Sequence, residues 1–546
     1  MDKRRFFMSI LPPMGLAAIF VLLVALVSPF YEAALDDSWN FALPTKHFLE
    51  TGVPVFDPFN SAAAVLHIVW GGLFCKIIGF SFSACRLSNI AMALISTLAL
   101  YWAFRQRPFD RATSFFAAAA FAVNPVLMVT AYTYQSDIVY LALTFFSTGF
   151  YLRYLRTLRH TDLLAASIIV GLSIWNKMHG SLLAGGAFVF FALTHRKNAI
   201  RGLRWLTISA VPAVFIVGFR LAKPIIHPVS TTLDGKMVEF TDRLFSPSVW
   251  LFDGSQRFLL MIAACGLYAL PLFCGWLFAR KDEPGVSMPV RIGVGLFWLV
   301  AVAGGLASLG GGHDGTYPFH SSVFRELPPL PDNFAFHVAT KLAWPLGALL
   351  GAHLTLASLD AIRNRGRTLL LLGLLVPQML LLVPILLFMD RYFLVLFPLM
   401  FLILAERFDG RRFRWVLATP VLIAFFLLGA TRIVHYRNSN VAQWEAAQWL
   451  MDQGAPSLEI DGGYAWTGWH NYEHSLAHPD IDRSRPGDNW YIGELDRSTD
   501  VQYVVSFFPP PPQDTLIRTF DYDYWFANEP GKVYVSKRPY AVWPPK

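Results

Sequence analysis

The sequence predicts an all-α polytopic membrane bundle of about thirteen transmembrane helices, followed by a small soluble α/β domain. Three observations lead to this fold class. The chain has 546 residues, of which 55% are hydrophobic and only 15% are charged, and its mean hydropathy is +0.44. Apolar runs of about 20 residues, the length that crosses a bilayer, recur between residues 12 and 437. From about Asn438 onward, charged and aromatic residues mix and the apolar runs shorten.

The first predicted span covers residues 12–31. It follows a basic start but lacks a small-residue cleavage site, so we interpret it as a retained anchor and not as a signal peptide. The stretch 36–83 then mixes acids, Pro and Gly with two shorter helical patterns, Ser38–Glu50 and Ala62–Ile78. Their amphipathic composition is typical of helices that lie along the membrane surface.

The other apolar runs are expected to cross the membrane. They cover residues 84–104, 112–131, 138–155, 162–177, 180–195, 203–222, 257–279, 290–309, 338–360, 367–389, 391–406 and 413–435. Two connections, 223–256 and 310–337, are too polar for the hydrocarbon core, and either could close over a substrate. The glycine-rich segment 310–315 follows an apolar helix without strand-loop-helix context, so a flexible lid or a simple connection is favoured over a nucleotide loop.

The C-terminal part is expected to be a soluble α/β domain. A helical pattern, Val441–Gln453, precedes three strand patterns, which are Ser457–Ile460, Val501–Phe507 and Lys532–Ser536. We therefore divide the chain into a membrane domain, 1–437, which includes the interfacial helices within 36–83, and a soluble domain, 438–546.

The formal net charge is +8, but Lys and Arg are spread in small clusters on every second connection. This distribution follows the positive-inside rule, and it offers no single basic face for nucleic acid. We expect a multi-pass protein of the plasma (bacterial inner) membrane, surrounded by membrane lipids, with a cytoplasmic N-terminus and an extracytoplasmic C-terminal domain.

Acidic residues at two predicted membrane exits are the first candidates for chemistry. Asp36 and Asp37 follow the first span, and Asp137 recurs on the same face. A charged group at the hydrocarbon boundary is unfavourable unless it faces water, protein or a bound ion, which makes these acids functional candidates. The alternative is that they cap helix starts, where a carboxylate accepts from free N–H groups.

Basic residues on the same face are candidates for binding a phosphate. Lys177 and Arg391 fall at predicted outer ends of spans, and Arg86 lies at the start of the second span. Arg offers a bidentate fork to phosphate oxygens, and Lys offers a mobile point charge. The alternatives are snorkelling or interfacial anchoring for Lys177 and Arg86, and an ordinary ion pair for Arg391, which adjoins Asp390.

A series of short motifs connects these candidates. In chain order they are Asp36-Asp37, Glu50-Thr51-Gly52, Asp57-Pro58-Phe59-Asn60, Arg86-Leu87-Ser88, Asn124-Pro125, Ser136-Asp137, Asn176-Lys177 and Arg391-Tyr392. With this series the chain resembles the GT-C glycosyltransferases, in the branch of the lipid A aminoarabinose transferases and protein O-mannosyltransferases. The resemblance covers the first 180 residues well, the middle and the Arg391 segment loosely, and the C-terminal domain hardly at all.

The resemblance implies an integral membrane glycosyltransferase. Such enzymes move a sugar from a polyprenyl-phosphate carrier to a lipid, glycan or protein acceptor on the outer face. Asp36 matches the catalytic acid position with Asp37 beside it, and Asp137 matches an acid that orients the acceptor or holds a cation. Lys177 and Arg391 match basic positions suited to the donor phosphate. Converging acids need a cation or a raised pKa; Mg or Mn is a possible cofactor, although no metal-ligand spacing is visible.

One departure limits the resemblance. The Glu-Lys pair that aminoarabinose transferases carry in the first outer loop is replaced here by residues 61–67, which end in His67. A metal site on that Glu and a phosphate contact from that Lys cannot be carried over, and His67 and His179 are expected to be polar edge residues. The alternative function is a transporter or flippase of an anionic or lipid-linked substrate, which would show ionisable groups at mid-membrane depth and internal repeats.

Overall fold

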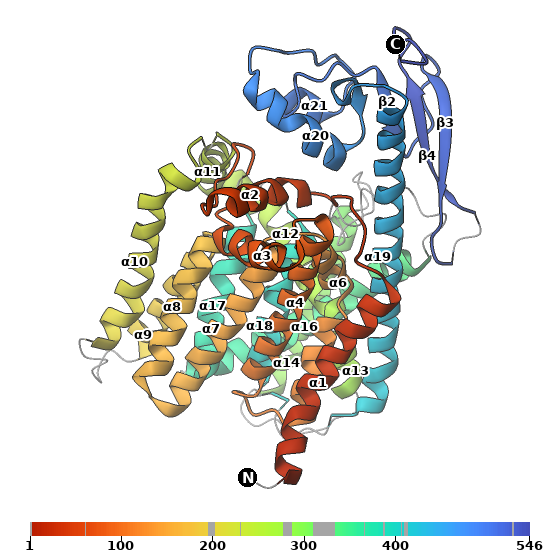
Figure 1. Cartoon of the computed structure of the whole chain (residues 1–546). Helices are drawn as coiled ribbons and strands as arrows, with labels where there is room; N and C mark the ends of the chain where they lie inside the picture. The colour runs from red at the N-terminus through yellow and green to blue at the C-terminus, as the bar shows by residue number, and fades with distance from the viewer. Residues whose placement is uncertain are drawn as a thin grey trace.

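A helical bundle is covered at one end by a smaller domain of helices and strands, and the N-terminus lies at the opposite end (Figure 1). This architecture comes from a computed structural model, which describes residues 3–60, 62–194, 203–229, 231–276, 287–309, 334–364, 366–385, 388–405, 407–408, 413–526 and 529–545. The predicted mainly helical membrane protein is confirmed at this level.

The first half of the bundle contains nine labelled helices. They are α1 (Lys3–Leu26), α2 (Ser38–Thr51), α3 (Val65–Ile78), α4 (Phe82–Phe104), α5 (Arg111–Ala122), α6 (Pro125–Tyr132), α7 (Asp137–Thr157), α8 (His160–Asn176) and α9 (Gly180–Thr194). Helices α2 and α3 lie across the end of the bundle that carries the C-terminal domain (Figure 1), and their position at the membrane surface stays a prediction. Helices α5 and α6 meet at 57°, because the Asn124 side chain caps a new helix that has Pro125 in its first turn.

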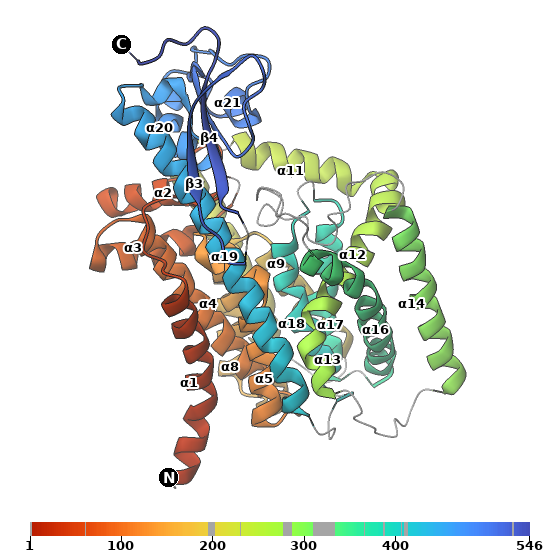
Figure 2. The ribbon, with the colours of Figure 1, turned by 90° about the vertical axis from the view of Figure 1, so that its right-hand side faces the viewer.

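The second half follows in chain order. It comprises α10 (Leu203–Ile226), α11 (Thr231–Leu244), the π-helical turn η1 (Val249–Asp253), α12 (Gly254–Tyr268), α13 (Leu270–Trp276), α14 (Met288–Leu309), α16 (Phe334–Asn364), α17 (Arg367–Leu382), the 3₁₀ turn η2 (Asp390–Leu394), α18 (Leu396–Leu404) and α19 (Trp415–Asp452). The prediction that residues 223–256 form a loop is wrong, because this segment contains helix α11. Helix α11 lies across the end of the bundle that carries the C-terminal domain (Figure 2). Most of the other connection, with its glycine-rich segment, lies outside the described residues.

Five described helices are long and apolar enough to cross a membrane, or seven if each of two bent pairs forms one span. The five are Phe82–Phe104, Asp137–Thr157, Arg204–Ile226, Lys341–Arg363 and Trp415–Asp452. Other apolar helices, such as Gly180–Thr194 and Arg367–Leu382, are shorter. The count of about thirteen spans therefore remains a prediction.

Small residues let the bundle helices approach closely. A Cβ atom at Gly186 of α9 would overlap the main chain of Gly373 in α17, and one at Gly266 of α12 would overlap Gly347 in α16. Glycine contacts of this kind are common between membrane helices, whose association relies on close van der Waals packing. Helices α12, α16 and α17 pack against α18, which is buried over its whole length.

The C-terminal domain contains a four-stranded sheet with the order β1-β2-β4-β3. The strands are β1 (Ile460–Asp461), β2 (Tyr503–Ser506), β3 (Thr515–Tyr522) and β4 (Gly531–Lys537), accompanied by η3 (Ser457–Glu459), α20 (Tyr464–Ala477) and α21 (Trp490–Glu494). β1 pairs with β2 in parallel, and the other pairs are antiparallel. Strands β2 and β4 lie where strand patterns predicted them, whereas the edge strand β3 was not predicted, because it is largely exposed and lacks a regular apolar alternation.

Helix α19 connects the bundle to this domain without a break. It is 38 residues long, or about 57 Å at 1.5 Å per residue, and it packs against α6 and α13 at one end and against β3 and β4 at the other. The predicted helix 441–453 is the last part of it. The helix also runs through the predicted domain boundary at residue 437, so the division of the chain there remains a prediction.

Aromatic side chains attach α20 to α2. The Trp39 side chain on α2 is fully buried and packs against Tyr472 of α20 at a centroid distance of 5.2 Å. A Cβ atom at Gly468 would clash with the Trp39 ring, and the Tyr472 hydroxyl accepts a 3.1 Å hydrogen bond from the Phe59 N–H. The C-terminal domain is therefore packed directly onto the end of the bundle.

A buried acid makes the stability of this domain dependent on pH. Asp496 is fully buried, and burial, with the nearby Asp461, raises its pKa to about 7. The folded protein therefore keeps a proton that the unfolded chain loses near pH 4. The resulting stabilisation is complete below that pH and is lost as the pH rises through about 7.

We therefore expect Asp496→Asn to raise the Tm of the protein at pH 8 and to weaken the pH dependence of Tm between pH 5 and pH 8. Thermal unfolding of both proteins across this range measures the effect. Parallel Tm curves for the wild type and the variant would show that Asp496 titrates normally.

Candidate active site at the end of the bundle

Arg86 fixes the segment that leads from α1 to α2. Its guanidinium is buried and donates four hydrogen bonds to main-chain oxygens, those of Pro29 (2.6 Å), Tyr31 (3.0 Å), Ala33 (2.9 Å) and Tyr132 (3.0 Å). Arg86 is thus engaged within the protein, which differs from the expected phosphate contact and from the alternative of interfacial anchoring. This geometry supports a structural role for Arg86, which holds in place the segment that ends in Asp36 and Asp37.

Asp36 and Asp37 follow this segment and differ in conformation. Asp36 has a φ of 51°, in the left-handed region that Asp and Asn tolerate better than most residues, and its Oδ2 accepts a 3.2 Å hydrogen bond from Gln135 Nε2. Asp37 occupies the position before α2, but its side chain makes no capping hydrogen bond. The capping alternative therefore does not describe Asp37.

The Arg391 guanidinium gathers three carboxylates. Nη1 lies 3.2 Å from Asp36 Oδ2, Nη2 lies 3.4 Å from Asp37 Oδ2, and Nε lies 3.8 Å from Asp137 Oδ2. The Arg391, Asp36 and Asp137 side chains are less than 10% exposed, whereas that of Asp37 is 28% exposed. The acids therefore do converge, and Arg391 supplies the cation that offsets their repulsion.

Lys177 completes the charge cluster from the other side. It directly follows α8, and its Nζ lies 2.6 Å from Asp137 Oδ1. The preceding residue, Asn176, holds this corner, because its Nδ2 donates to Ser136 O at 2.9 Å and its carbonyl accepts from Ala64 N–H at 2.9 Å. Lys177 points into the protein and does not snorkel.

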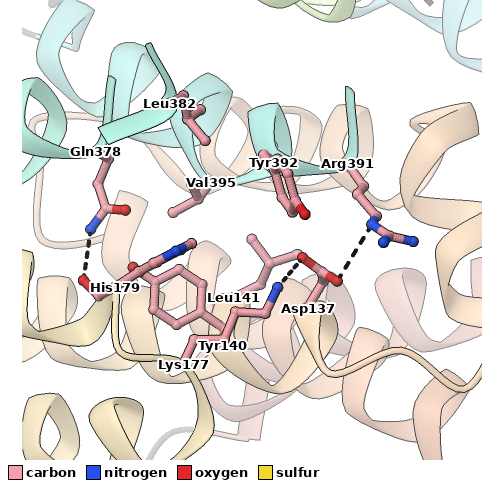
Figure 3. Close-up of a pocket in the computed structure, with 10 residues that line it drawn as sticks. All are labelled: Asp137, Tyr140, Leu141, Lys177, His179, Gln378, Leu382, Arg391, Tyr392 and Val395. Atoms are coloured by element: carbon pink, nitrogen blue, oxygen red, sulfur yellow. Dashed lines mark hydrogen bonds and ion pairs between the residues drawn. The ribbon is translucent and has the colours of Figure 1, made fainter. Parts of the chain in front are cut away.

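A cavity lies beside these charges (Figure 3). The cavity itself is small, about 20 Å³, and the empty space in and around it, about 350 Å³, includes open solvent. Its lining residues are Asp137, Tyr140, Leu141, Lys177, His179, Gln378, Leu382, Arg391, Tyr392 and Val395. One end is charged and the remaining wall is largely apolar, an arrangement that suits an amphiphilic ligand with an anionic group.

Comparisons with known proteins locate the fold among the membrane glycosyltransferases. Residues 66–219 match the family model described as dolichyl-phosphate-mannose-protein mannosyltransferase. The crystal structure of the Archaeoglobus fulgidus oligosaccharyltransferase tethered with an acceptor peptide containing the NVT sequon aligns over 92% of this chain and 70% of that chain, with 14% identity and a TM-score of 0.52. The chain has the GT-C fold. Together with the family match, this fold supports assignment to the GT-C superfamily.

Two further solved structures align with lower TM-scores. The archaeal oligosaccharyltransferase AglB from Archaeoglobus fulgidus, in complex with an inhibitory peptide and a dolichol-phosphate, has a TM-score of 0.48, 15% identity and coverage of 91% of this chain and 69% of that chain. ArnT from Cupriavidus metallidurans, bound to undecaprenyl phosphate, has a TM-score of 0.44, 12% identity and coverage of 97% of both chains. No curated protein sequence matches this chain.

The residues of the candidate site do not fit a divalent cation as they are arranged. Within the described part of the chain, no group of three or more His, Cys, Asp or Glu side chains is placed to share one ion. Asp36 Oδ2 already pairs with Arg391, and Asp137 Oδ1 already pairs with Lys177. A divalent ion there would meet a guanidinium instead of a set of free oxygen ligands.

The two histidines behave differently from each other. His67 is fully buried between the rings of Phe41 and Tyr134, at centroid distances of 5.2 and 4.1 Å. The expected polar edge position is therefore wrong for His67. His179 lines the cavity, with its carbonyl accepting from Gln378 Nε2 at 3.4 Å (Figure 3).

Several residues of the candidate site were not predicted to take part in it. Gln135 directly adjoins the Ser136-Asp137 motif, so its neighbourhood in the sequence was a usable signal. Tyr392 belonged to the Arg391-Tyr392 motif, but no role was assigned to it. Lys236 of α11 has an exposed side chain and interacts electrostatically with Asp37 and Arg391, but its segment was interpreted as a loop. Tyr464 contacts Asp37 from the C-terminal domain, where the family resemblance provides no motif.

Proposed function

We propose that the chain is a glycosyltransferase that moves a sugar from a polyprenyl-phosphate carrier to a lipid, glycan or protein acceptor on the extracytoplasmic face. The observation that carries this proposal is the convergence of Asp36, Asp37 and Asp137 on Arg391 and Lys177, beside a cavity with an apolar wall. The family match supports a lipid-phosphate donor. The candidate charges gather at one end of the bundle, which favours transfer over the transporter alternative.

In this mechanism the Asp36-Asp37 pair supplies the general base. The acceptor hydroxyl attacks the anomeric carbon, its proton passes to a carboxylate, and the bond between the anomeric carbon and the carrier phosphate oxygen breaks. Asp37 is the more exposed member of the pair, so it is the one that an acceptor from the aqueous side reaches first. Asp36 is more deeply buried, and its Oδ2 accepts hydrogen bonds from Gln135 and Arg391.

The leaving carrier phosphate gains negative charge as that bond breaks. Lys177 and Arg391 both line the cavity, where they would stabilise this charge by electrostatic interaction in a partly water-excluded site. The carrier chain would lie along the apolar wall that includes Leu141, Leu382 and Val395. Asp137 holds the Lys177 ammonium at 2.6 Å and thereby orients it.

The purified protein in lipid nanodiscs, incubated with a panel of radiolabelled undecaprenyl-phosphate monosaccharides and a membrane extract as acceptor source, tests this function. We expect free undecaprenyl phosphate to accumulate. Lys177→Met should lower kcat/KM by about 10²-fold or more, since it removes a charge that stabilises the leaving group. The exposed Lys76→Met is the matched control and should retain wild-type turnover. Absence of carrier release by the wild type with every donor would refute the proposal.

A further inference from the structure

The C-terminal domain reaches the proposed base directly. Tyr464, the first residue of α20, donates a 2.7 Å hydrogen bond from its hydroxyl to Asp37 Oδ1. Burial and the neighbouring Asp37 carboxylate both raise the pKa of Tyr464 well above its ordinary value. The phenol therefore stays protonated and remains the donor in this bond.

The Tyr464 ring is held by other aromatic rings on both sides of the interface. It lies 5.8 Å from Trp39 of α2, 5.6 Å from Trp490 and 5.8 Å from Tyr491. Trp39 is itself fully buried and lies against Gly468, one turn further along α20. The position of the hydroxyl is thus fixed by packing from the bundle and from the C-terminal domain.

Asp37 is held through both of its oxygens. Oδ1 accepts from Tyr464 at 2.7 Å, and Oδ2 faces Arg391 Nη2 at 3.4 Å. Asp36 adjoins it in sequence, and Lys236 of α11 interacts with it electrostatically. Two contacts on opposite oxygens define the orientation of the carboxylate plane, which one contact cannot do.

We propose that Tyr464 is a positioning residue of the transfer site, through which the C-terminal domain orients the Asp37 carboxylate toward the acceptor. This inference rests on the proposed function. A base acts only when it lies within hydrogen-bond reach of the proton it removes, and a misplacement of about 1 Å can lower the rate about 10²-fold. The domain therefore belongs to the catalytic unit, although Tyr464 is 427 positions from Asp37 in the sequence.

Tyr464→Phe tests this inference, because it keeps the ring packing and removes only the hydroxyl. We expect kcat for carrier release to fall about 10- to 100-fold, with the KM for the labelled donor within about twofold and the Tm nearly unchanged. Tyr491→Phe is the matched control, since its hydroxyl bonds Asp461 at 2.6 Å inside the same domain. Wild-type kcat in Tyr464→Phe, or an equal loss in Tyr491→Phe, would overturn the inference.

Amide hydrogen exchange supplies a readout that needs no activity. Peptides covering residues 33–41 should exchange faster in Tyr464→Phe than in the wild type, and at the wild-type rate in Tyr491→Phe. If the wild type transfers no sugar, the proposed function fails, and the exchange comparison still decides whether Tyr464 holds the Asp36-Asp37 segment. Unchanged exchange in Tyr464→Phe would refute the positioning role even in an active enzyme.

Discussion

Replacement of Arg391 by glutamine is expected to abolish carrier release and to lower the Tm of the protein. The guanidinium is buried among Asp36, Asp37 and Asp137, so its removal leaves carboxylates without their common partner. Breaking a buried ion pair on one side costs about 3–5 kcal/mol, and loss of a cation that stabilises the leaving phosphate lowers kcat by about 10²–10³-fold or more. Turnover of labelled donor and thermal unfolding measure the two effects separately.

Arg153→Gln is the control for this prediction. Arg153 pairs with the buried Asp162 at 3.4 Å, but its own side chain is 37% exposed and it lies toward the other end of α7. We expect wild-type turnover and a change in stability below about 1 kcal/mol. Combining Arg391→Gln with Asp37→Asn should recover part of the lost stability without recovering turnover, because it removes one of the unpaired charges. An active Arg391→Gln enzyme would show that the guanidinium is not part of the site.

Asp36→Asn and Asp137→Asn are each expected to reduce sugar transfer by about 10³-fold or more while leaving the fold intact. At position 36 the amide removes one charge of the Asp36-Asp37 pair that supplies the base and the partner of Arg391 Nη1, and Asn tolerates the left-handed backbone found there. At position 137 it removes the charge that holds Lys177 and faces Arg391. Turnover at saturating donor, with Tm as a check on folding, measures both effects.

Asp162→Asn is the matched substitution. Asp162 is also a buried acid in the first turn of a helix, α8, but it pairs with Thr157 and Arg153 away from the candidate site. Its turnover should remain that of the wild type. Wild-type turnover in both Asp36→Asn and Asp137→Asn would eliminate the proposed mechanism.

The sequence located the charged groups of the site but not their partners. Asp36, Asp137, Lys177 and Arg391 were placed on one face because each falls at a predicted exit from the membrane, and the structure brings them together. Arg391 and Asp36 are 355 positions apart, so their contact depends on helix packing that no local pattern reports. Arg86 was predicted to contact a phosphate, but its partners are main-chain oxygens. Every residue has such an oxygen, so the sequence does not indicate which of them an arginine will contact.

The errors in the fold have similar physical causes. Helix α11 was missed because its residues are polar on one side, and a search for continuous apolar runs rejects such a segment even when helical periodicity is present. Tyr464 was missed because a tyrosine among many aromatic residues carries no chemical signature until its partner is known. Helix α11 and Tyr464 both lie at the end of the bundle that carries the C-terminal domain (Figure 2), where the structure depends on packing between segments that are distant in the sequence.

The unbroken path of α19 has a consequence for the surrounding lipid. A helix that enters a soluble domain without a hinge transmits its tilt to that domain, and the tilt of a spanning helix responds to the thickness of the hydrocarbon layer. Because α20 is also packed onto α2, a change in bilayer thickness would act on the contact between the Tyr464 hydroxyl and Asp37. The acyl-chain length of the lipid would thus influence the candidate site through α19, a continuous helix of about 57 Å.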